Sequence, residues 1–103
     1  MKRMAKTALK ILEYLLPSDE VFDEVCAKDV DVDDYVLFRE QLDVLYEKDC
    51  IEVPPRSISE IDLSTLNFVN KIKSVETKVK IGLTVEGALL IPKLRAILNH
   101  PKA

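Results

Sequence analysis

Glycine, tryptophan and long apolar runs are scarce in this sequence, and each shortage narrows the choice of fold. Two glycines and no tryptophan among 103 residues argue against a loop-rich or all-β architecture. No apolar run approaches the roughly 20 residues that a membrane-spanning helix needs, and the basic start has no small-residue cleavage site. The length suits one modest core. We therefore expect a single cytoplasmic domain with no membrane contact.

Side chains that carry catalysis or bind metals are also sparse. Cys26 and Cys50 lack CxxC spacing, and the only histidine is the distant His100. Buried thiols are therefore expected rather than a disulfide or a zinc site. The aspartates of residues 29–34 resemble a calcium loop only in composition, because the central glycine is missing. With no plausible nucleophile arrangement and no glycine-rich phosphate loop, we predict no enzymatic activity, no metal and no cofactor.

Charge is plentiful but unevenly distributed. The net charge is −3, yet residues 11–52 contain fourteen acidic residues against three basic ones. Residues 1–10 and 53–103 each carry a net +4. This asymmetry bears more on function than the total does, because the local field decides which partners are attracted.

Three helices are expected in the first half of the chain. Leucines at helical spacing predict a helix over residues 4–16, which Pro17 ends. Ser18 can cap a second helix that runs to about residue 27. Its inward side chains would be Val21, Phe22 and Val25. A third helix is predicted from a cap at Asp33 to about residue 48. Its inward side chains would be Tyr35, Phe38, Leu42, Leu45 and Tyr46.

The second half predicts a hairpin and a last helix. Asp49 stands where a helix end favours a residue that tolerates the left-handed conformation, and residues 50–53 then form a strand. Residues 54–74 form an insertion, with a helix over 59–73. A second strand follows over 75–83. Thr84 caps a final helix over about 85–99, which Pro92 should kink.

Three motifs carry a family resemblance: Phe22-Asp23-Glu24-Val25, the step from Leu42 through Asp49 to Ile51, and the element from Leu83 through Gly87 and Pro92 to Leu94. With them, the chain resembles the winged-helix transcription regulators of the MarR type and particularly the HxlR type. HxlR-type proteins usually carry a cysteine near the N-terminus, and this chain has none. Its insertion at 54–74 is also longer than the family norm.

The resemblance implies an α+β winged helix-turn-helix fold with three N-terminal helices, a two-stranded wing and a C-terminal helix. It also implies a dimeric DNA-binding transcription regulator. The third helix would enter the major groove, the wing would touch the minor groove or backbone, and the terminal helices would pair two subunits.

The charges around the third helix oppose binding of DNA through that helix. Its outer face is expected to show Asp33, Asp34, Leu37, Glu40 and Gln41. Carboxylates at the mouth of a groove oppose the phosphate contacts that supply most of the affinity for DNA. DNA binding would then be led by the wing and the N-terminal arm. The candidate contacts are Lys71, Lys73, Lys78, Lys80, Arg39, Lys2, Arg3 and Lys6. The alternative for these cations is that they are solvated charges without a partner.

A second function stays open beside DNA binding. The acidic face of the second and third helices would bind a basic protein, as in an adaptor or a viral or plasmid accessory protein. In either case a homodimer is expected, with a seam along the last helix formed by Leu90, Leu94, Ile97 and Leu98. The alternative for that stripe is packing against the first helix of the same chain.

Overall fold

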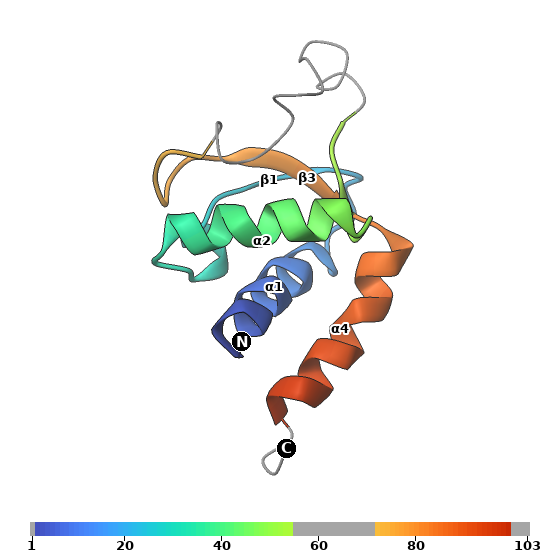
Figure 1. The fold of residues 1–103 in the computed structure, drawn as a ribbon. Helices are drawn as coiled ribbons and strands as arrows, with labels where there is room; N and C mark the ends of the chain where they lie inside the picture. The colour runs from blue at the N-terminus through green and yellow to red at the C-terminus, as the bar shows by residue number, and fades with distance from the viewer. Residues whose placement is uncertain (1, 55–71, 100–103) are drawn as a thin grey trace.

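The computed structural model describes residues 2–54 and 72–99, which form an α+β fold (Figure 1). Three α-helices in this part of the chain are α1 (Lys2–Leu15), α2 (Tyr35–Glu47) and α4 (Val85–Asn99). A short 3-10 turn, η1 (Lys28–Val30), precedes α2. The strands are β1 (Asp23–Val25), β2 (Ile51–Glu52) and β3 (Val79–Leu83). None of the described helices has the length and apolarity needed to cross a lipid bilayer.

The sheet is antiparallel, with β3 in the centre and the order β1-β3-β2. Val25 pairs with Val79 on one side of β3, and Ile51 pairs with Leu83 on the other. The described elements follow the order helix, strand, 3-10 turn, helix, strand, strand, helix. This order is broadly compatible with the expected winged-helix-like arrangement.

The predicted second helix over residues 18–27 is wrong. Ser18 does accept a hydrogen bond from the Glu20 backbone at 3.1 Å, but no helix follows it. Residues 23–25 instead form β1, in which Val25 is completely buried in the core. Val21, which precedes the strand, is 70% exposed. Three apolar residues at helical spacing are too short a signal to distinguish a helix from a strand, and tertiary pairing overrides so weak a preference.

The other predicted elements that fall on described residues agree with the structure apart from their ends. The helices predicted over 4–16 and 85–99 are found at Lys2–Leu15 and Val85–Asn99. The strand predicted over 75–83 begins only at Val79, because the Thr77 hydroxyl accepts hydrogen bonds from the backbone of Lys73 and Ser74 and holds a turn there. The predicted helix over 59–73 lies outside the described residues, except at 72 and 73, which are not helical.

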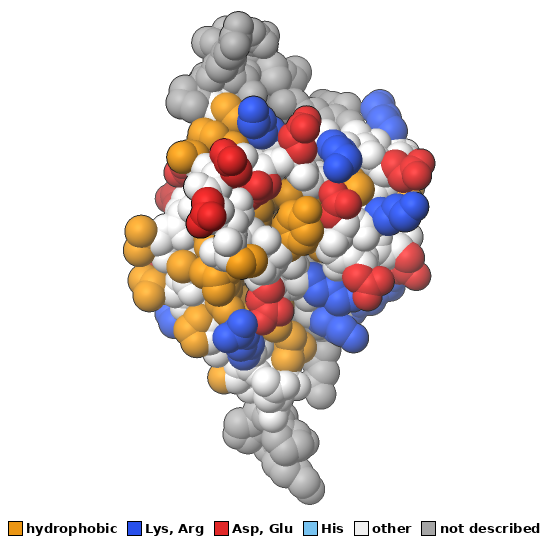
Figure 2. All heavy atoms as spheres, turned by 180° about the vertical axis from the view of Figure 1, so that it is seen from behind, with side chains coloured by type: hydrophobic (Ala, Val, Ile, Leu, Met, Phe, Trp, Pro, Cys, Tyr) orange, Lys and Arg blue, Asp and Glu red, His pale blue; other side chains and the backbone are white. Residues whose placement is uncertain are grey.

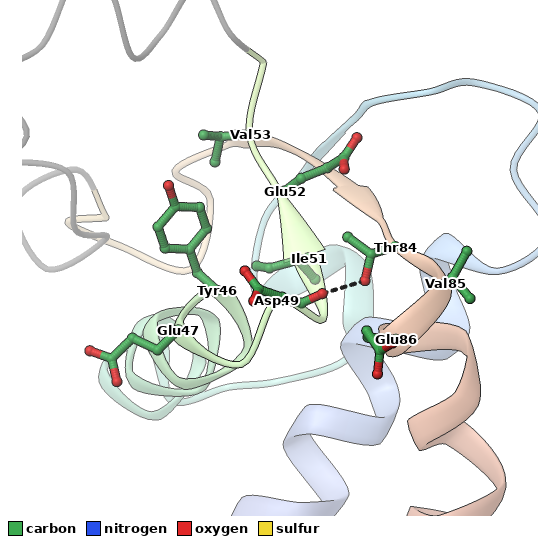
Figure 3. Close-up of a pocket in the computed structure, with 9 residues that line it drawn as sticks. All are labelled: Tyr46, Glu47, Asp49, Ile51, Glu52, Val53, Thr84, Val85 and Glu86. Atoms are coloured by element: carbon green, nitrogen blue, oxygen red, sulfur yellow. Dashed lines mark hydrogen bonds between the residues drawn. The ribbon is translucent and has the colours of Figure 1, made fainter.

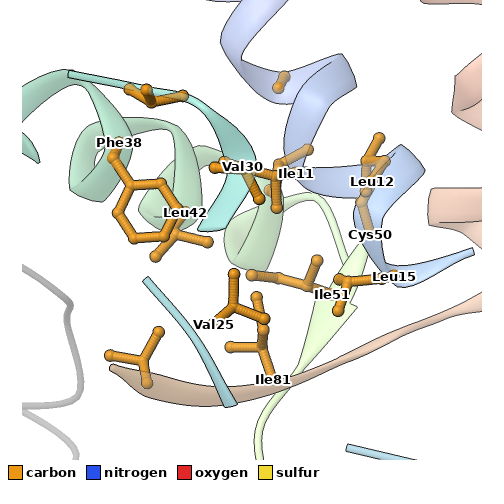
Figure 4. Close-up of a cluster of buried hydrophobic side chains, with 14 of the residues drawn as sticks. Ile11, Leu12, Leu15, Val25, Val30, Phe38, Leu42, Cys50, Ile51 and Ile81 are labelled. Atoms are coloured by element: carbon orange, nitrogen blue, oxygen red, sulfur yellow. The ribbon is translucent and has the colours of Figure 1, made fainter. Parts of the chain in front are cut away.

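One apolar core lies between the sheet and the helices (Figure 4). Helix α1 contributes Ile11 and Leu12, and α2 contributes Phe38 and Leu42, all with no exposed surface. Ile81 from the central strand closes the cluster from the sheet side. Burying an aromatic or branched side chain of this size stabilises a fold by roughly 1.5–3 kcal/mol each. The core therefore fixes α2 against the sheet and decides which of its sides faces solvent.

Candidate protein-interaction surface

The outer side of α2 carries valines and acids. Val36, Glu40, Val44 and Glu47 recur at helical spacing and are exposed, whereas Phe38, Gln41, Leu42 and Leu45 are buried. The expectation that Gln41 lies on the outer face is therefore wrong, since only 6% of it is accessible. Leu37 is half-buried. The face that would enter a DNA groove thus presents no basic side chain of its own.

Asp34, rather than the predicted Asp33, caps α2. One carboxylate oxygen of Asp34 accepts from the backbone N–H groups of Val36 and Leu37 at 3.1 and 3.2 Å. The other oxygen pairs with Arg3 at 3.2 Å. Both carboxylate oxygens of Asp34 are therefore already bound within the protein. Asp33, by contrast, is exposed and has no ion pair in the described part of the chain.

The C-terminal end of α2 turns sharply into β2. Asp49 has a φ of 60°, as predicted for a left-handed helix end. The N–H of Asp49 donates to the carbonyl of Tyr46, and the N–H of Cys50 donates to the carbonyl of Leu45 at 2.8 Å, which is the hydrogen-bond pattern of a Schellman motif. Thr84 joins this turn to α4, because its hydroxyl donates to the Asp49 carbonyl at 2.6 Å and accepts from the N–H of Gly87.

An open concavity of about 680 Å³ lies where these three segments meet (Figure 3). Its described lining residues are Tyr46, Glu47, Asp49, Ile51, Glu52, Val53, Thr84, Val85 and Glu86. Four of them are carboxylates and none is basic. Figure 3 shows the Tyr46 ring on one side of β2 and Glu86 on the other. We call Glu40 and the four carboxylates of this concavity the acidic surface.

Among the described residues, the acids of the acidic surface lack cationic partners. No ion pair joins Glu40, Glu47, Asp49, Glu52 or Glu86 to any described residue. Lys48 directly follows α2 but does not line the concavity. Like charges held this close together without counterions attract cations from solution. The macrodipole at the end of α2 adds to this attraction, and the start of α4 at the same place offsets it, so the carboxylates dominate.

Arg39, a predicted DNA contact, is folded back on the protein. Its guanidinium lies 5.4 Å from the centre of the Tyr35 ring and donates to the carbonyl of Ile72 at 3.2 Å. Arg39 therefore fastens residue 72 to α2 and is half-buried.

The remaining predicted DNA contacts divide into paired and unpaired cations. Arg3 pairs with Asp34, and Lys78 pairs with Asp29 at 3.4 Å. Lys6, Lys73 and Lys80 are exposed and have no ion pair among the described residues. Lys71 and the side chain of Lys2 lie outside what the structure describes. Figure 2 shows the consequence on the face opposite α2, where basic and acidic side chains alternate instead of forming a basic patch.

Asp29 and Lys78 shift each other's protonation. Partial burial raises the pKa of Asp29, but hydrogen bonds from Cys26 and the charge of Lys78 outweigh it, so the pKa is lowered. The carboxylate of Asp29 in turn raises the pKa of Lys78. Both groups therefore hold their charges more firmly, and they cancel locally.

The predicted dimer seam on α4 is largely turned inward. Leu94 is 8% exposed, and Leu90 and Leu98 are half-buried, because α4 packs against α1. Leu94 therefore belongs to the core of its own chain and cannot join a seam. Of the four residues, Ile97 is the exposed one, at 55%.

Both cysteines are free and buried, as expected. Burial and, after it, the charge of Glu86 raise the pKa of the Cys50 thiol, which makes it a poor nucleophile. Within residues 2–54 and 72–99, no three His, Cys, Asp or Glu side chains are grouped so that they could hold a metal ion.

Sequence reasoning missed the concavity. A signal was present, since a Thr that caps a helix just after a strand places the following Glu86 beside the turn at Asp49. Comparison with models of protein families, with curated proteins and with solved structures gives no match to this chain.

Proposed function

We propose that this chain is a winged-helix-like protein-interaction module whose acidic surface binds a basic segment of a partner protein. One observation carries the proposal: the exposed side of α2 and the concavity at its end present carboxylates and valines, with no basic side chain among their described residues. Complementary charge raises the association rate and selects basic partners. The half-exposed valines Val36 and Val44 add apolar contact area beside the acids.

A basic peptide tests this function directly. Isotope-labelled protein is titrated with a blocked lysine-rich peptide, and the backbone amide shifts are followed by NMR. We expect shifts at Glu40 and Glu47, and the binding should weaken as salt is raised. The double substitution Glu40→Lys/Glu47→Lys should abolish both the binding and the chemical-shift changes. Glu20→Lys/Glu24→Lys, which changes equally exposed acids elsewhere, is the matched control and should leave binding within about twofold. Binding that depends on the control pair and not on Glu40 and Glu47 would overturn the proposal.

Wing-led DNA binding is the second candidate, and a specific observation favours it. Lys73 and Lys80 lie exposed near β3 without ion pairs among the described residues, so they are available for phosphates. A gel-shift titration with random duplex DNA at about 50 and 200 mM salt decides between the two. Salt-sensitive binding that Lys73→Glu/Lys80→Glu abolishes, and that the exposed-residue control Lys48→Glu leaves intact, would establish DNA as the partner. The absence of a shift at low salt favours the protein-binding function.

A further inference from the structure

Helix α4 is apolar on two opposite sides. Towards the core it presents Gly87, Ile91 and Leu94, which are buried, followed by half-buried Leu98. Towards solvent it presents Val85, Leu89, Pro92 and Ala96, all exposed. Val85 and Leu89 are 75% and 58% accessible, more than any other large apolar side chain of this helix. A surface helix of a monomer normally has one apolar stripe and a polar opposite face, so a second stripe indicates a second packing partner.

The exposed stripe has the spacing of a helix–helix seam. From Val85 to Ala96 the intervals are four, three and four residues, which is the a/d repeat of a coiled coil. The stripe spans roughly 16 Å at 1.5 Å per residue. Figure 2 shows apolar side chains gathered on the side of the molecule where α4 lies. By contrast, the valines of α2 stand among acids.

The charges beside the stripe select the partner. Arg95 is held by Glu13 of α1 at 2.6 Å, so Glu86 and Lys93 are the charges on α4 without an ion pair in the described residues. They stand seven residues apart on the same flank of the stripe. In an antiparallel pair of identical helices related by a twofold axis, Leu89 faces Pro92 of the second copy and Val85 faces its Ala96. The same symmetry brings Glu86 of each copy to Lys93 of the other, twice.

We infer that two copies of this chain associate through α4, antiparallel, along Val85, Leu89, Pro92 and Ala96. The observations that carry this inference are the second apolar stripe and its self-complementary flanking charges. The inference does not rest on the proposed function, although Val85 and Glu86 also line the concavity. In the dimer, Lys93 of each copy would pair with Glu86 at the rim of the other copy's concavity, which leaves Glu40, Glu47, Asp49 and Glu52 for a basic partner. Two acidic surfaces on one particle would then allow bivalent binding.

A charge swap tests this register. Sedimentation equilibrium of the full chain across a concentration series should show twice the monomer mass of 11.7 kDa. Leu89→Asp should give a monomer. Glu86→Lys and Lys93→Glu should each weaken association about tenfold, because each sets like charges together twice. Combining both changes should restore it, and mixing the two single variants should give a heterodimer by native mass spectrometry.

Controls keep the outcome specific. Val36→Asp changes an exposed valine on α2 and should leave the dimer intact, and circular dichroism confirms that each variant is folded. A wild-type monomer at every concentration would overturn the inference. A dimer that survives Leu89→Asp would overturn it as well, because the seam would then lie elsewhere. Loss of the dimer in the double swap, with the fold intact, would overturn the antiparallel register.

Discussion

Two groups of carboxylates in this chain differ in their ion pairs: those around η1 have cationic partners, and those around β2 have none among the described residues. Around η1, Asp29, Asp31 and Asp34 each lie within 4 Å of a cation, at 3.4 Å from Lys78, 3.8 Å from Lys10 and 3.2 Å from Arg3 respectively. Around β2, Glu47, Asp49, Glu52 and Glu86 have no such partner among the described residues.

The difference lies in what the backbone does nearby. Asp29 and Asp34 accept hydrogen bonds from backbone N–H groups at the turns on either side of η1, which orients them towards cations of α1 and of the segment before β3. The side chains of the carboxylates around β2 cap no described helix and form no ion pair with a described residue. A segment's net charge therefore does not give its local field, and among the described residues the concavity gathers four carboxylates that have no ion pair.

Removing acids from the two regions should have unequal effects on stability. Asp29→Ala/Asp34→Ala loses a backbone hydrogen bond and a helix cap, so the free energy of unfolding should fall by about 2–3 kcal/mol. Glu47→Ala/Glu52→Ala should change it by less than about 0.5 kcal/mol. Urea unfolding measures both. Equal losses would show that the acids around β2 are structural after all.

Among the residues that line the concavity, Thr84 should contribute to stability through its hydroxyl group. Thr84→Val removes the cap of α4 and the hydrogen bond to the Asp49 carbonyl, and the free energy of unfolding should fall by about 1–2 kcal/mol. Thr84→Ser keeps the hydroxyl and is the matched control. If serine destabilises as much as valine, the methyl group and not the hydrogen bonds carries the effect.

The local elements of the fold were predictable because their signals are local. Three features each depend on a few adjacent residues: the left-handed end at Asp49, the cap at Thr84, and the alternation of buried Val79 and Ile81 with exposed Lys80 in β3. The strand at residues 23–25 was not predictable, because it exists only through pairing with residues 79–81, more than fifty positions later. The Phe22–Val25 motif therefore forms no helix, although its spacing suggested one.

The candidate surface was predictable only in part. Acid density correctly marked Glu40 on the outer side of α2, but it also marked Asp34, whose carboxylate is used up by the cap and by Arg3. The concavity combines residues 46–53 with 84–86, and only the folded chain brings these two segments together. The stripe predicted as a dimer seam lies largely against α1, since both sides of α4 have seam spacing and the sequence does not say which one α1 covers.

Acid should weaken the region around η1 through Asp29. The pKa of this carboxyl is lowered in the folded state, so its contribution to stability is present above its unfolded pKa of about 3.9 and is lost as pH falls through the folded pKa. The melting temperature of the wild type should therefore exceed that of Asp29→Asn at neutral pH and converge with it in strong acid. Lys78→Met should show part of the same loss at neutral pH, because it removes one of the two sources of the shift. A constant difference between wild type and Asp29→Asn at all pH values would contradict this origin.

The smallest expected effect is a change in the alkylation rate of the Cys50 thiol, which lies near Glu86. Burial raises the pKa of Cys50 first and the charge of Glu86 adds to it, so Glu86→Gln should lower the pKa slightly while the thiol stays buried. Alkylation of Cys50 by iodoacetamide at mildly alkaline pH, followed by peptide mass spectrometry, should then accelerate by less than about threefold, since a full pKa unit would give tenfold. Glu24→Gln, an exposed acid on β1, is the control and should leave the rate unchanged. Equal alkylation rates in Glu86→Gln and Glu24→Gln would mean that the charge of Glu86 does not affect the Cys50 thiol. The acids around β2 would then influence only molecules that approach the concavity from solution.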